Sequence, residues 1–293
     1  MKPTIGFVGL GLMGGSLSRH LLAAGFELIV HDADPDKVEA LVKAGGTAAG
    51  APERIASQVD IIVLSLPDSK VVSAVINDSL RLFEIGRQGL IVLDTSTAAP
   101  AVSVAMAAKL GERGIEMLDS TISGTATMCA AKESLFMVGG TKEAYEQCVP
   151  LFAAMAKDSI YMGPSGTGAA IKLVVNLVLA LNRMALAEGL TLARKAGLDQ
   201  AQTLDVLKKS AAYSKAMDQK GPRMVNRHFV PPEGLLGMQY KDVQLMLELG
   251  DKLNCPLPLL TLNAAALAAE IAKGRDHWDT SDIISYYDER ADR

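Results

Sequence analysis

The sequence of 293 residues has few cysteines and histidines, the residues that build disulfide frameworks and most zinc sites. Its three cysteines are far apart and show no CxxC spacing; they are Cys129, Cys148 and Cys255. An odd number at such distances predicts reduced thiols in a cytoplasmic protein. The four histidines show no metal-ligand spacing; they are His20, His31, His228 and His277. The sequence therefore predicts no metal centre.

Basic clusters, internal repeats and low-complexity segments are also missing from the chain. The formal net charge is -4 at pH 7, and no run of Lys and Arg offsets it, so we expect no nucleic-acid partner. Met1-Lys2-Pro3 leads directly into Thr4–Val8, which already resembles a strand and leaves no room for a signal peptide. These absences predict a soluble, cytoplasmic protein.

Apolar residues, by contrast, are abundant, at 49% against 21% charged residues. This balance is typical of a protein with a substantial core, and the length allows two domains. One apolar run is unusually long, from Gly166 to about Gly197, and no proline interrupts it. It predicts a helix of roughly 40 Å that is apolar on every side and therefore buried.

A membrane span is the competing interpretation of this run. Polar residues interrupt it before it reaches the ~20 apolar residues that a bilayer requires; they are Asn176, Asn182, Arg183 and Glu188. We therefore predict a buried helix and no membrane partner. Lys172 and Asn176 are four residues apart, so they project from one face of its first turns. They are either a structural pair that satisfies nearby polar groups or two groups that face a cleft.

The beginning of the chain has the pattern of a dinucleotide-binding unit. The strand Ile5–Val8 is followed by a G-x-G-x-x-G loop, a helix pattern up to Gly25 and a second strand, Phe26–His31. In this order the glycines allow a tight turn, close approach of the backbone to a pyrophosphate, and close packing of the helix, whose amino end favours phosphates. The predicted cofactor-binding residues of the loop are Gly9, Leu10, Gly11, Leu12, Met13 and Gly14.

Asp32 closes the second strand roughly 20 residues after the loop, where an acid accepts hydrogen bonds from a ribose 2′-hydroxyl. The alternative is that Asp32 belongs to the amino end of the helix that starts near Pro35, a place that Asp34 could fill as well. An acid at this point repels a 2′-phosphate and favours NAD as the cofactor. Lys37 is close enough in sequence to leave NADP open.

Strands and helices continue to alternate through the first half of the chain. Further strands are predicted at 60–67, 90–94, 115–119 and 135–139, and a helix at 99–113. This alternation predicts a parallel sheet covered on both faces, with ligands beyond the carboxyl ends of its strands. There, Ser96 could cap a helix or contact a ligand. Ser123-Gly124-Thr125 lies in a loop that could present N–H groups and hydroxyls to an anion.

After residue 164 the strand pattern disappears. Helices are predicted at 200–210, 241–253, 258–273 and 280–290, with a break at Gly221-Pro222 and an aromatic pair at Tyr286-Tyr287. The sequence therefore predicts two domains. Residues 1–164 form an α/β Rossmann-type domain that binds NAD(P), and residues 165–293 form an all-α domain that begins with the long interdomain helix.

Four motifs resemble those of the β-hydroxyacid dehydrogenase family, which includes 3-hydroxyisobutyrate dehydrogenase and tartronate semialdehyde reductase. They are Gly9–Gly14, Asp119–Gly124, Gly166-Thr167-Gly168 with Lys172 and Asn176, and Lys241-Asp242. The resemblance runs over essentially the full length. It implies that Lys172 is the catalytic general acid and base, that Asn176 helps to hold the substrate, and that Ser123 and Gly124 contact its carboxylate. The residues it implies in cofactor binding are Leu66, Pro67, Thr97 and Lys241.

Three departures from the family pattern bear on the substrate. Asp119–Thr125 differs from the usual Asp-Ala-Pro-Val-Ser-Gly-Gly, Lys132-Glu133-Ser134 replaces a usual Gly-Thr-Leu, and an aromatic residue is missing around Gly234-Leu235. We expect a homo-oligomeric NAD(P)-dependent oxidoreductase that acts on the β-carbon of a small 3-hydroxy acid or its semialdehyde. The alternatives are a reductase of another small aldehyde or imine, such as succinic semialdehyde or glyoxylate, and a non-catalytic NAD(P)-binding protein.

Overall fold

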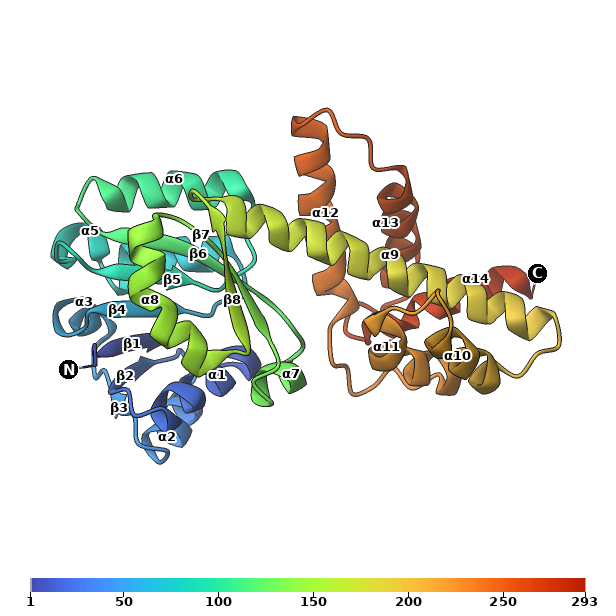
Figure 1. Ribbon diagram of the computed structural model, residues 1–293, viewed down its shortest axis with the longest axis horizontal. Helices are drawn as coiled ribbons and strands as arrows, with labels where there is room; N and C mark the ends of the chain where they lie inside the picture. The colour runs from blue at the N-terminus through green and yellow to red at the C-terminus, as the bar shows by residue number, and fades with distance from the viewer. Residues whose placement is uncertain (1, 293) are drawn as a thin grey trace. The chain divides into compact units, whose positions relative to one another are not determined.

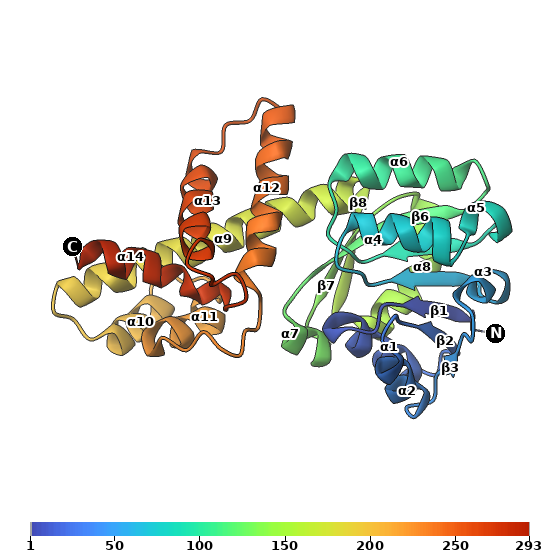
Figure 2. The ribbon, with the colours of Figure 1, turned by 180° about the vertical axis from the view of Figure 1, so that it is seen from behind.

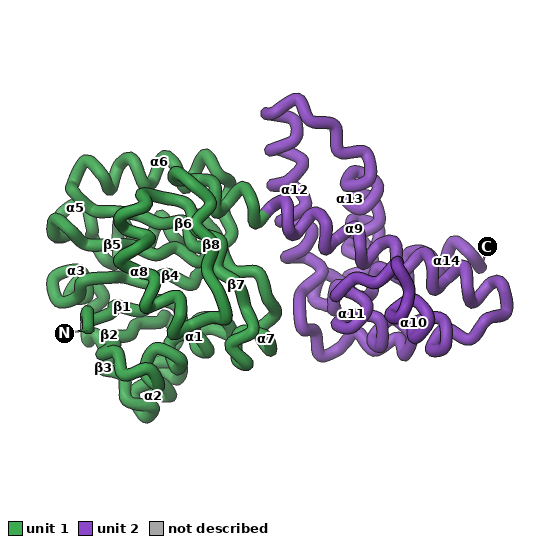
Figure 3. Tube along the Cα trace, viewed as in Figure 1, with its two compact units in different colours: residues 1–172 green, residues 173–293 purple. Residues whose placement is uncertain are grey.

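The computed structural model describes residues 2–292, which divide into two compact units (Figure 1 and Figure 3). Unit 1 covers residues 1–172 and unit 2 covers residues 173–293. Among the described residues, all strands belong to unit 1, and unit 2 is helical. Helix α9, Thr167–Lys195, links the two units. The predicted fold class, an α/β part followed by an all-α part joined by a long helix, is confirmed.

Unit 1 is built on a sheet of eight strands in the order β3-β2-β1-β4-β5-β6-β7-β8. The strands are β1 (Ile5–Val8), β2 (Leu28–His31), β3 (Thr47–Ala48), β4 (Ile61–Leu64), β5 (Ile91–Asp94), β6 (Glu116–Ser123), β7 (Leu135–Gly139) and β8 (Asp158–Gly163). Each predicted strand is present, and β6 extends past its predicted end to Ser123. The two edge strands, β3 and β8, were not predicted, because one is only 2 residues long and the other is half-exposed without a clear alternation.

One pair of strands corrects the prediction of a parallel sheet. β6 and β7 run antiparallel, with Ser120 opposite Val138, whereas the other strand pairs are parallel. The connection between them holds only α7 (Ala126–Ala130), a helix of 5 residues. A parallel crossover needs roughly a dozen residues or more, so this short connection returns the chain directly alongside β6.

Helices cover both faces of the sheet, as the opposite views of Figure 1 and Figure 2 show. Alternate strand residues point to different cores: Ile5 and Phe7 join one, and Val8 joins the other. The first core includes helices α1 (Leu12–Ala23), α2 (Pro35–Val42), α7 and α8 (Lys142–Met155). The second includes α3 (Ile55–Gln58), α4 (Ser69–Ala74), the π-helical turn η2 (Val75–Ser79), α5 (Leu82–Ile85) and α6 (Pro100–Gly111). A short 3₁₀ turn, η1 (Pro52–Arg54), precedes α3.

The length predicted for α9 is confirmed, since it has 29 residues, but the prediction that it is buried on every side is wrong. Val174 and Val178 are 51% exposed and Leu192 is 69% exposed. These residues share one face, so much of this face is apolar and exposed among residues 2–292. By length and composition α9 is the one helix of residues 2–292 that could cross a membrane. Long core helices of soluble proteins meet the same criterion.

Unit 2 packs its helices around a core of its own. Besides the rest of α9, they are α10 (Gln200–Lys209), α11 (Lys215–Asn226), α12 (Leu236–Lys252), α13 (Pro258–Ile271), the 3₁₀ turn η3 (Thr280–Asp282) and α14 (Ile283–Ala291). Gly221-Pro222 does not break the chain as predicted but lies inside α11. A Cβ on Gly221 would come within 2.5 Å of Leu204 on α10, so this glycine serves the close packing of two helices. The predicted aromatic pair is confirmed, because the rings of Tyr286 and Tyr287 meet edge to face at 5.4 Å.

Candidate active site

The glycine-rich loop joins β1 to α1, and its glycines have three different surroundings. Gly9 has a φ of +93°, and a Cβ there would lie 2.3 Å from the carbonyl oxygen of Ser65. A Cβ on Gly14 would lie 1.9 Å from the carbonyl oxygen of Gly9, so α1 approaches the loop only without a side chain. A Cβ on Gly11 would meet nothing within 4 Å, which leaves the backbone open to a ligand. Each surrounding matches one requirement of a dinucleotide loop.

The other loop residues fit the same geometry. Leu10 is buried, Met13 is half-buried, and Leu12 is 82% exposed on the outer side of the first turn. Gly11 is the N-cap of α1 and has no side chain to satisfy the first N–H groups of the helix. Because these groups lack acceptors within the helix itself, they are suited to bind phosphate oxygens.

Asp32, at the end of β2, is tied directly to this loop. Its Oδ2 accepts a hydrogen bond from Leu10 N at 2.6 Å, and its Oδ1 accepts one from Asp34 N at 2.9 Å. The role of helix cap belongs to Asp34, whose Oδ1 accepts a hydrogen bond from Asp36 N at 3.0 Å. Asp32 also lines a hollow of about 440 Å³ that β2, β3 and α2 surround. Its position at the strand end is therefore not explained by helix capping.

Leu66, Pro67 and Thr97 follow the carboxyl ends of the neighbouring strands β4 and β5. Leu66 and Thr97 are half-buried, and Pro67 is exposed. The hydroxyl of Ser96 does not cap a helix; it accepts a hydrogen bond from Leu66 N at 3.1 Å and connects the loops that follow β4 and β5. A contact between Ser96 and a ligand stays a prediction. Asp94 ends β5, and burial raises its pKa to about 6 although Ser96 N donates to it at 2.9 Å.

The loop predicted to bind an anion begins where β6 ends. Ser123, Gly124 and Thr125 are all half-buried. A Cβ on Gly124 would lie 3.1 Å from the Cβ of Ser134, so the loop packs tightly on one of the residues that depart from the family pattern. The hydroxyl of Thr125 accepts a hydrogen bond from Met128 N at 3.2 Å and caps α7. The Thr125 hydroxyl therefore caps a helix, and a substrate contact at this residue would have to use the same hydroxyl or the backbone.

Lys172 lies in the first turns of α9, next to this loop. Its Nζ donates a hydrogen bond to the carbonyl oxygen of Ile122 at 2.5 Å. Ile122 immediately precedes Ser123 in the chain. The ammonium group and the predicted carboxylate-binding loop therefore lie together within unit 1, a proximity that the separation of the two motifs in sequence could not reveal.

A buried carboxylate fixes the start of α9. Asp119 of β6 accepts hydrogen bonds from Gly166 N at 2.8 Å and from Ala169 N at 2.7 Å. A negative charge at this end of a long helix also interacts favourably with its dipole. Burial nevertheless raises the pKa of Asp119, against the lowering effect of these N–H donors. The sequence shows Asp119 only as the first residue of a family-like motif, and the structure identifies it as the residue that anchors the turn before Lys172.

Asn176, one turn beyond Lys172, contacts a residue that was not among the predicted site residues. Its Nδ2 donates a hydrogen bond to Oδ2 of Asp242 on α12 at 3.1 Å. Lys241 Nζ lies 3.5 Å from Oδ1 of the same carboxylate. Asp242, the second member of the Lys-Asp pair, therefore holds the amide of Asn176 and lies next to Lys241.

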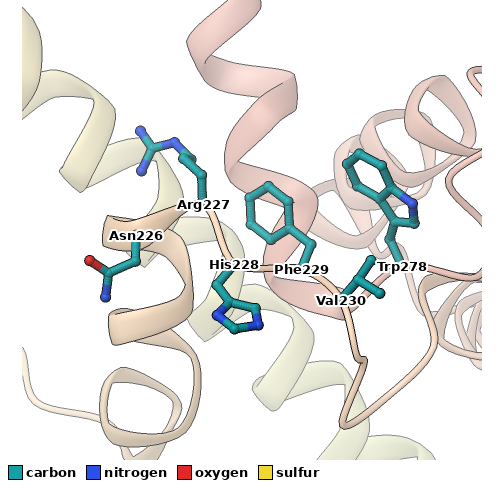
Figure 4. A pocket seen from close by; sticks show the side chains of 6 residues that line it. All are labelled: Asn226, Arg227, His228, Phe229, Val230 and Trp278. Atoms are coloured by element: carbon teal, nitrogen blue, oxygen red, sulfur yellow. The ribbon is translucent and has the colours of Figure 1, made fainter.

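A separate hollow of about 350 Å³ lies in unit 2 after the end of α11 (Figure 4). It is lined by Asn226, Arg227, His228, Phe229, Val230 and Trp278. None of the predicted site residues lines it. Among residues 2–292 there is also no group of three or more His, Cys, Asp or Glu side chains that could hold a metal ion.

Two families match the chain along most of its length. Residues 4–163 match the NAD binding domain of 6-phosphogluconate dehydrogenase, and residues 166–287 match the family described as "NAD-binding of NADP-dependent 3-hydroxyisobutyrate dehydrogenase". This chain belongs to the β-hydroxyacid dehydrogenase family. The family resemblance noted in the sequence is thereby confirmed. As a member of this family, the protein is an NAD(P)-dependent oxidoreductase.

Relatives of this β-hydroxyacid dehydrogenase carry the names of different substrates. It is 30% identical over 285 residues to 2-(hydroxymethyl)glutarate dehydrogenase of Eubacterium barkeri, covering 97% of this chain and 95% of that protein. It is 29% identical over 280 residues to glyoxylate/succinic semialdehyde reductase 1 of Arabidopsis thaliana, covering 96% of each. The solved structure of Mycobacterium tuberculosis 3-hydroxyisobutyrate dehydrogenase with L-serine is similar, with a TM-score of 0.88 and 27% identity over 97% of this chain and 99% of that one. Membership in the family identifies the class of reaction but not which substrate this protein uses.

Proposed function

We propose that this β-hydroxyacid dehydrogenase transfers a hydride between NAD and the β-carbon of a short 3-hydroxy acid or its semialdehyde, with Lys172 moving the proton. The observation that carries the proposal is the hydrogen bond from Lys172 Nζ to the Ile122 carbonyl. It places an ammonium group beside the loop that starts with Ser123. An acid–base group next to an anion-binding loop is the arrangement that oxidation of a hydroxy acid requires.

The chemistry divides between the cofactor and the protein. A bound nicotinamide supplies the hydride chemistry, so the residues of the chain have to bind the acid and manage one proton. In oxidation the neutral amine of Lys172 accepts the proton of the substrate hydroxyl and becomes the ammonium; in reduction the ammonium donates this proton to the carbonyl oxygen. Ser123 Oγ and the backbone N–H of Gly124 bind the carboxylate through charge-assisted hydrogen bonds. Asn176, held by Asp242, orients the substrate.

The loop residues 9–14 fit the pyrophosphate of a dinucleotide, because Gly11 is open and the amino end of α1 lies next to it. Asp32 supports NAD as the preferred cofactor, since its carboxylate would face the ribose. Lys37 offers little to a 2′-phosphate, because its Nζ lies 3.3 Å from Asp34 and 3.9 Å from Asp32. Two acids already surround this cation.

The expected result is a kcat/KM for NADH that exceeds the value for NADPH by at least about tenfold, because a phosphate next to a carboxylate is repelled. Initial rates with both cofactors at one substrate concentration series measure this. The variant Asp32→Asn keeps an acceptor for Leu10 N and removes the negative charge. It should therefore lower the ratio of kcat/KM with NADH to kcat/KM with NADPH. Equal or better efficiency of the wild type with NADPH contradicts the proposal.

The substrate carboxylate is tested by removing its charge alone. We expect 3-hydroxyisobutyrate to be oxidised with a kcat/KM about 10- to 100-fold above that of its methyl ester, because charge-assisted hydrogen bonds are stronger than neutral ones. The variant Ser123→Ala should reduce this ratio by lowering the efficiency with the acid. If the ester and the acid react equally well in the wild type, carboxylate binding at Ser123 is not what selects the substrate.

A further inference from the structure

Ser134, immediately before β7, is a polar residue in a fully buried place. It is 0% exposed, and its hydroxyl has no hydrogen-bond partner among residues 2–292. The polar group beside it is the thiol of Cys129, whose pKa Ser134 lowers against the larger, raising effect of burial. A thiol is only a weak hydrogen-bonding group. The hydroxyl therefore gains little in this place, and the property of Ser134 that the packing uses is its small size.

Ser134 faces Gly124, in the loop predicted to bind the carboxylate. In the antiparallel ladder of β6 and β7, Ser123 is opposite Leu135, and the same register continued by one residue places Gly124 opposite Ser134. A Cβ built on Gly124 would lie 3.1 Å from the Cβ of Ser134 and 3.4 Å from its Cα. The backbone of Gly124 therefore packs directly on Ser134, and no further side chain fits between them.

Of these two residues, Ser134 has the more firmly held backbone. Its carbonyl oxygen accepts a hydrogen bond from Lys157 N at 3.1 Å, and the next residue, Leu135, is paired within the ladder. Gly124, by contrast, follows the last paired residue of β6 and begins a loop. Extra volume at position 134 would therefore displace the backbone of Gly124, because a filled core yields where it is held least.

The acceptor that holds Lys172 lies inside the same ladder. Ile122, whose carbonyl oxygen accepts a hydrogen bond from Lys172 Nζ at 2.5 Å, is opposite Phe136. Gly124 comes two residues later and supplies the backbone N–H that we propose for the carboxylate. All of these residues belong to unit 1. A displacement of Gly124 would therefore change the carboxylate contact and leave the lysine in its place.

We propose that Ser134 is a positioning residue for the substrate. Its small side chain sets the place of the Gly124 backbone, and thereby the place of the substrate carboxylate relative to Lys172. The inference rests on the proposed function, because it concerns the same acid site. Ser134 is buried and acts only through Gly124. Its effect is therefore expected in the KM for the acid more than in kcat.

Side chains of increasing volume at position 134 test the proposal. Ser134→Ala adds no volume and removes an unpaired hydroxyl, so the KM for 3-hydroxyisobutyrate should stay within about twofold of the wild-type value. Ser134→Val and Ser134→Leu overpack the contact with Gly124, so this KM should rise in that order, by about 10- to 100-fold with leucine. The KM for NAD should change less than about threefold in all three variants, because the glycine-rich loop is untouched. The valine variant gives the answer if the leucine variant does not fold.

Ser103→Leu is the matched control. Ser103 is a buried serine of α6, a helix that contributes to the core on the opposite face of the sheet from α7. Overpacking there should lower the stability of unit 1 without raising the KM for the acid. An equal rise of this KM in Ser103→Leu and Ser134→Leu would show a general loss of packing and overturn the proposal. A rise in Ser134→Ala as large as in Ser134→Leu would assign the effect to the hydroxyl and would also overturn it.

Calorimetric titration with isobutyrate gives a reading that is independent of turnover, because this acid has the carboxylate and lacks the hydroxyl that is oxidised. Weaker binding of isobutyrate by Ser134→Leu than by the wild type and Ser134→Ala supports the positioning role. Equal binding by all three proteins, or no binding by the wild type, refutes it. If the wild type binds isobutyrate and oxidises no 3-hydroxy acid, the proposed function is wrong, and the titration still decides the role of Ser134.

Discussion

Replacing Lys172 with alanine is expected to lower kcat by about 100- to 10,000-fold, the usual contribution of a positioned general acid–base group. The structure gives the reason: the Nζ atom is held on the carbonyl of Ile122, at the entrance to the loop of Ser123 and Gly124, and the alanine variant leaves no group there to exchange a proton. Steady-state rates over a range of pH measure the loss. Binding of NADH, followed by fluorescence titration, should persist, because the glycine-rich loop is untouched.

The matched control is a lysine that is not expected to move a proton. Lys241→Ala removes an ammonium group from the neighbourhood of Asp242 and should raise the KM for the cofactor more than it lowers kcat. If Lys172→Ala keeps more than about a tenth of the wild-type turnover, another group carries the proton and the assignment of Lys172 is wrong.

Asp119→Ala is expected to lower the free energy of unfolding by about 3–5 kcal/mol, because Gly166 N and Ala169 N lose their acceptor in a buried place and a cavity is left. The effect should extend to catalysis, since the first turn of α9 positions Lys172. Chemical denaturation followed by circular dichroism measures the stability. A loss below about 1 kcal/mol would show that the start of α9 is held by its packing and not by this carboxylate.

Asp94 lies opposite Asp119 in the sheet and serves as the control. Replacing it is expected to raise the free energy of unfolding, whereas replacing Asp119 lowers it. Burial raises its pKa from 3.8 to about 6, so the folded protein holds this proton more tightly than the unfolded chain does. Stability from this group is present at low pH and is lost as pH rises through that range. Asp94→Asn keeps an acceptor for Ser96 N. Between pH 4 and pH 7, the free energy of unfolding of this variant relative to that of the wild type should rise by up to about 3 kcal/mol. No gain over this range would show that the carboxylate is stabilised in another way.

The parts of the fold that the sequence predicted well are those whose signal is local. The order strand, glycine-rich loop, helix and strand is contained within residues 5–31, and each glycine has a steric reason in the structure. Helix α9 was recognised because its apolar run is long and free of proline. Its exposed face was not, because Val174 and Val178 are as apolar as the residues that the helix buries. Periodicity reveals a buried side only when the other side is polar.

The parts that escaped prediction depend on contacts between distant residues. The antiparallel return of β7 follows from a connection whose five-residue helix cannot be distinguished by pattern from a longer crossover. Ser96 was ambiguous because a hydroxyl before a helix suggests a cap, whereas its partner, Leu66 N, lies on another strand connection. Arg183 was noticed only as an interruption of the apolar run. Among residues 2–292 its Nε is buried without a hydrogen-bond partner, which only the folded chain can show.

The acceptor that holds Lys172 is a main-chain carbonyl, and this has a consequence for how such enzymes diverge. Every residue type at position 122 offers the same oxygen, so mutations in the side chains of the loop after β6 do not delete the hydrogen bond that holds Lys172, the proposed proton donor. The helix start before Lys172 likewise binds Asp119 through backbone N–H groups. The position of Lys172 is therefore held through main-chain groups and depends little on the side chains of that loop. We therefore expect substitutions among the loop side chains to change the choice of substrate while the hydrogen bond that holds Lys172 is kept.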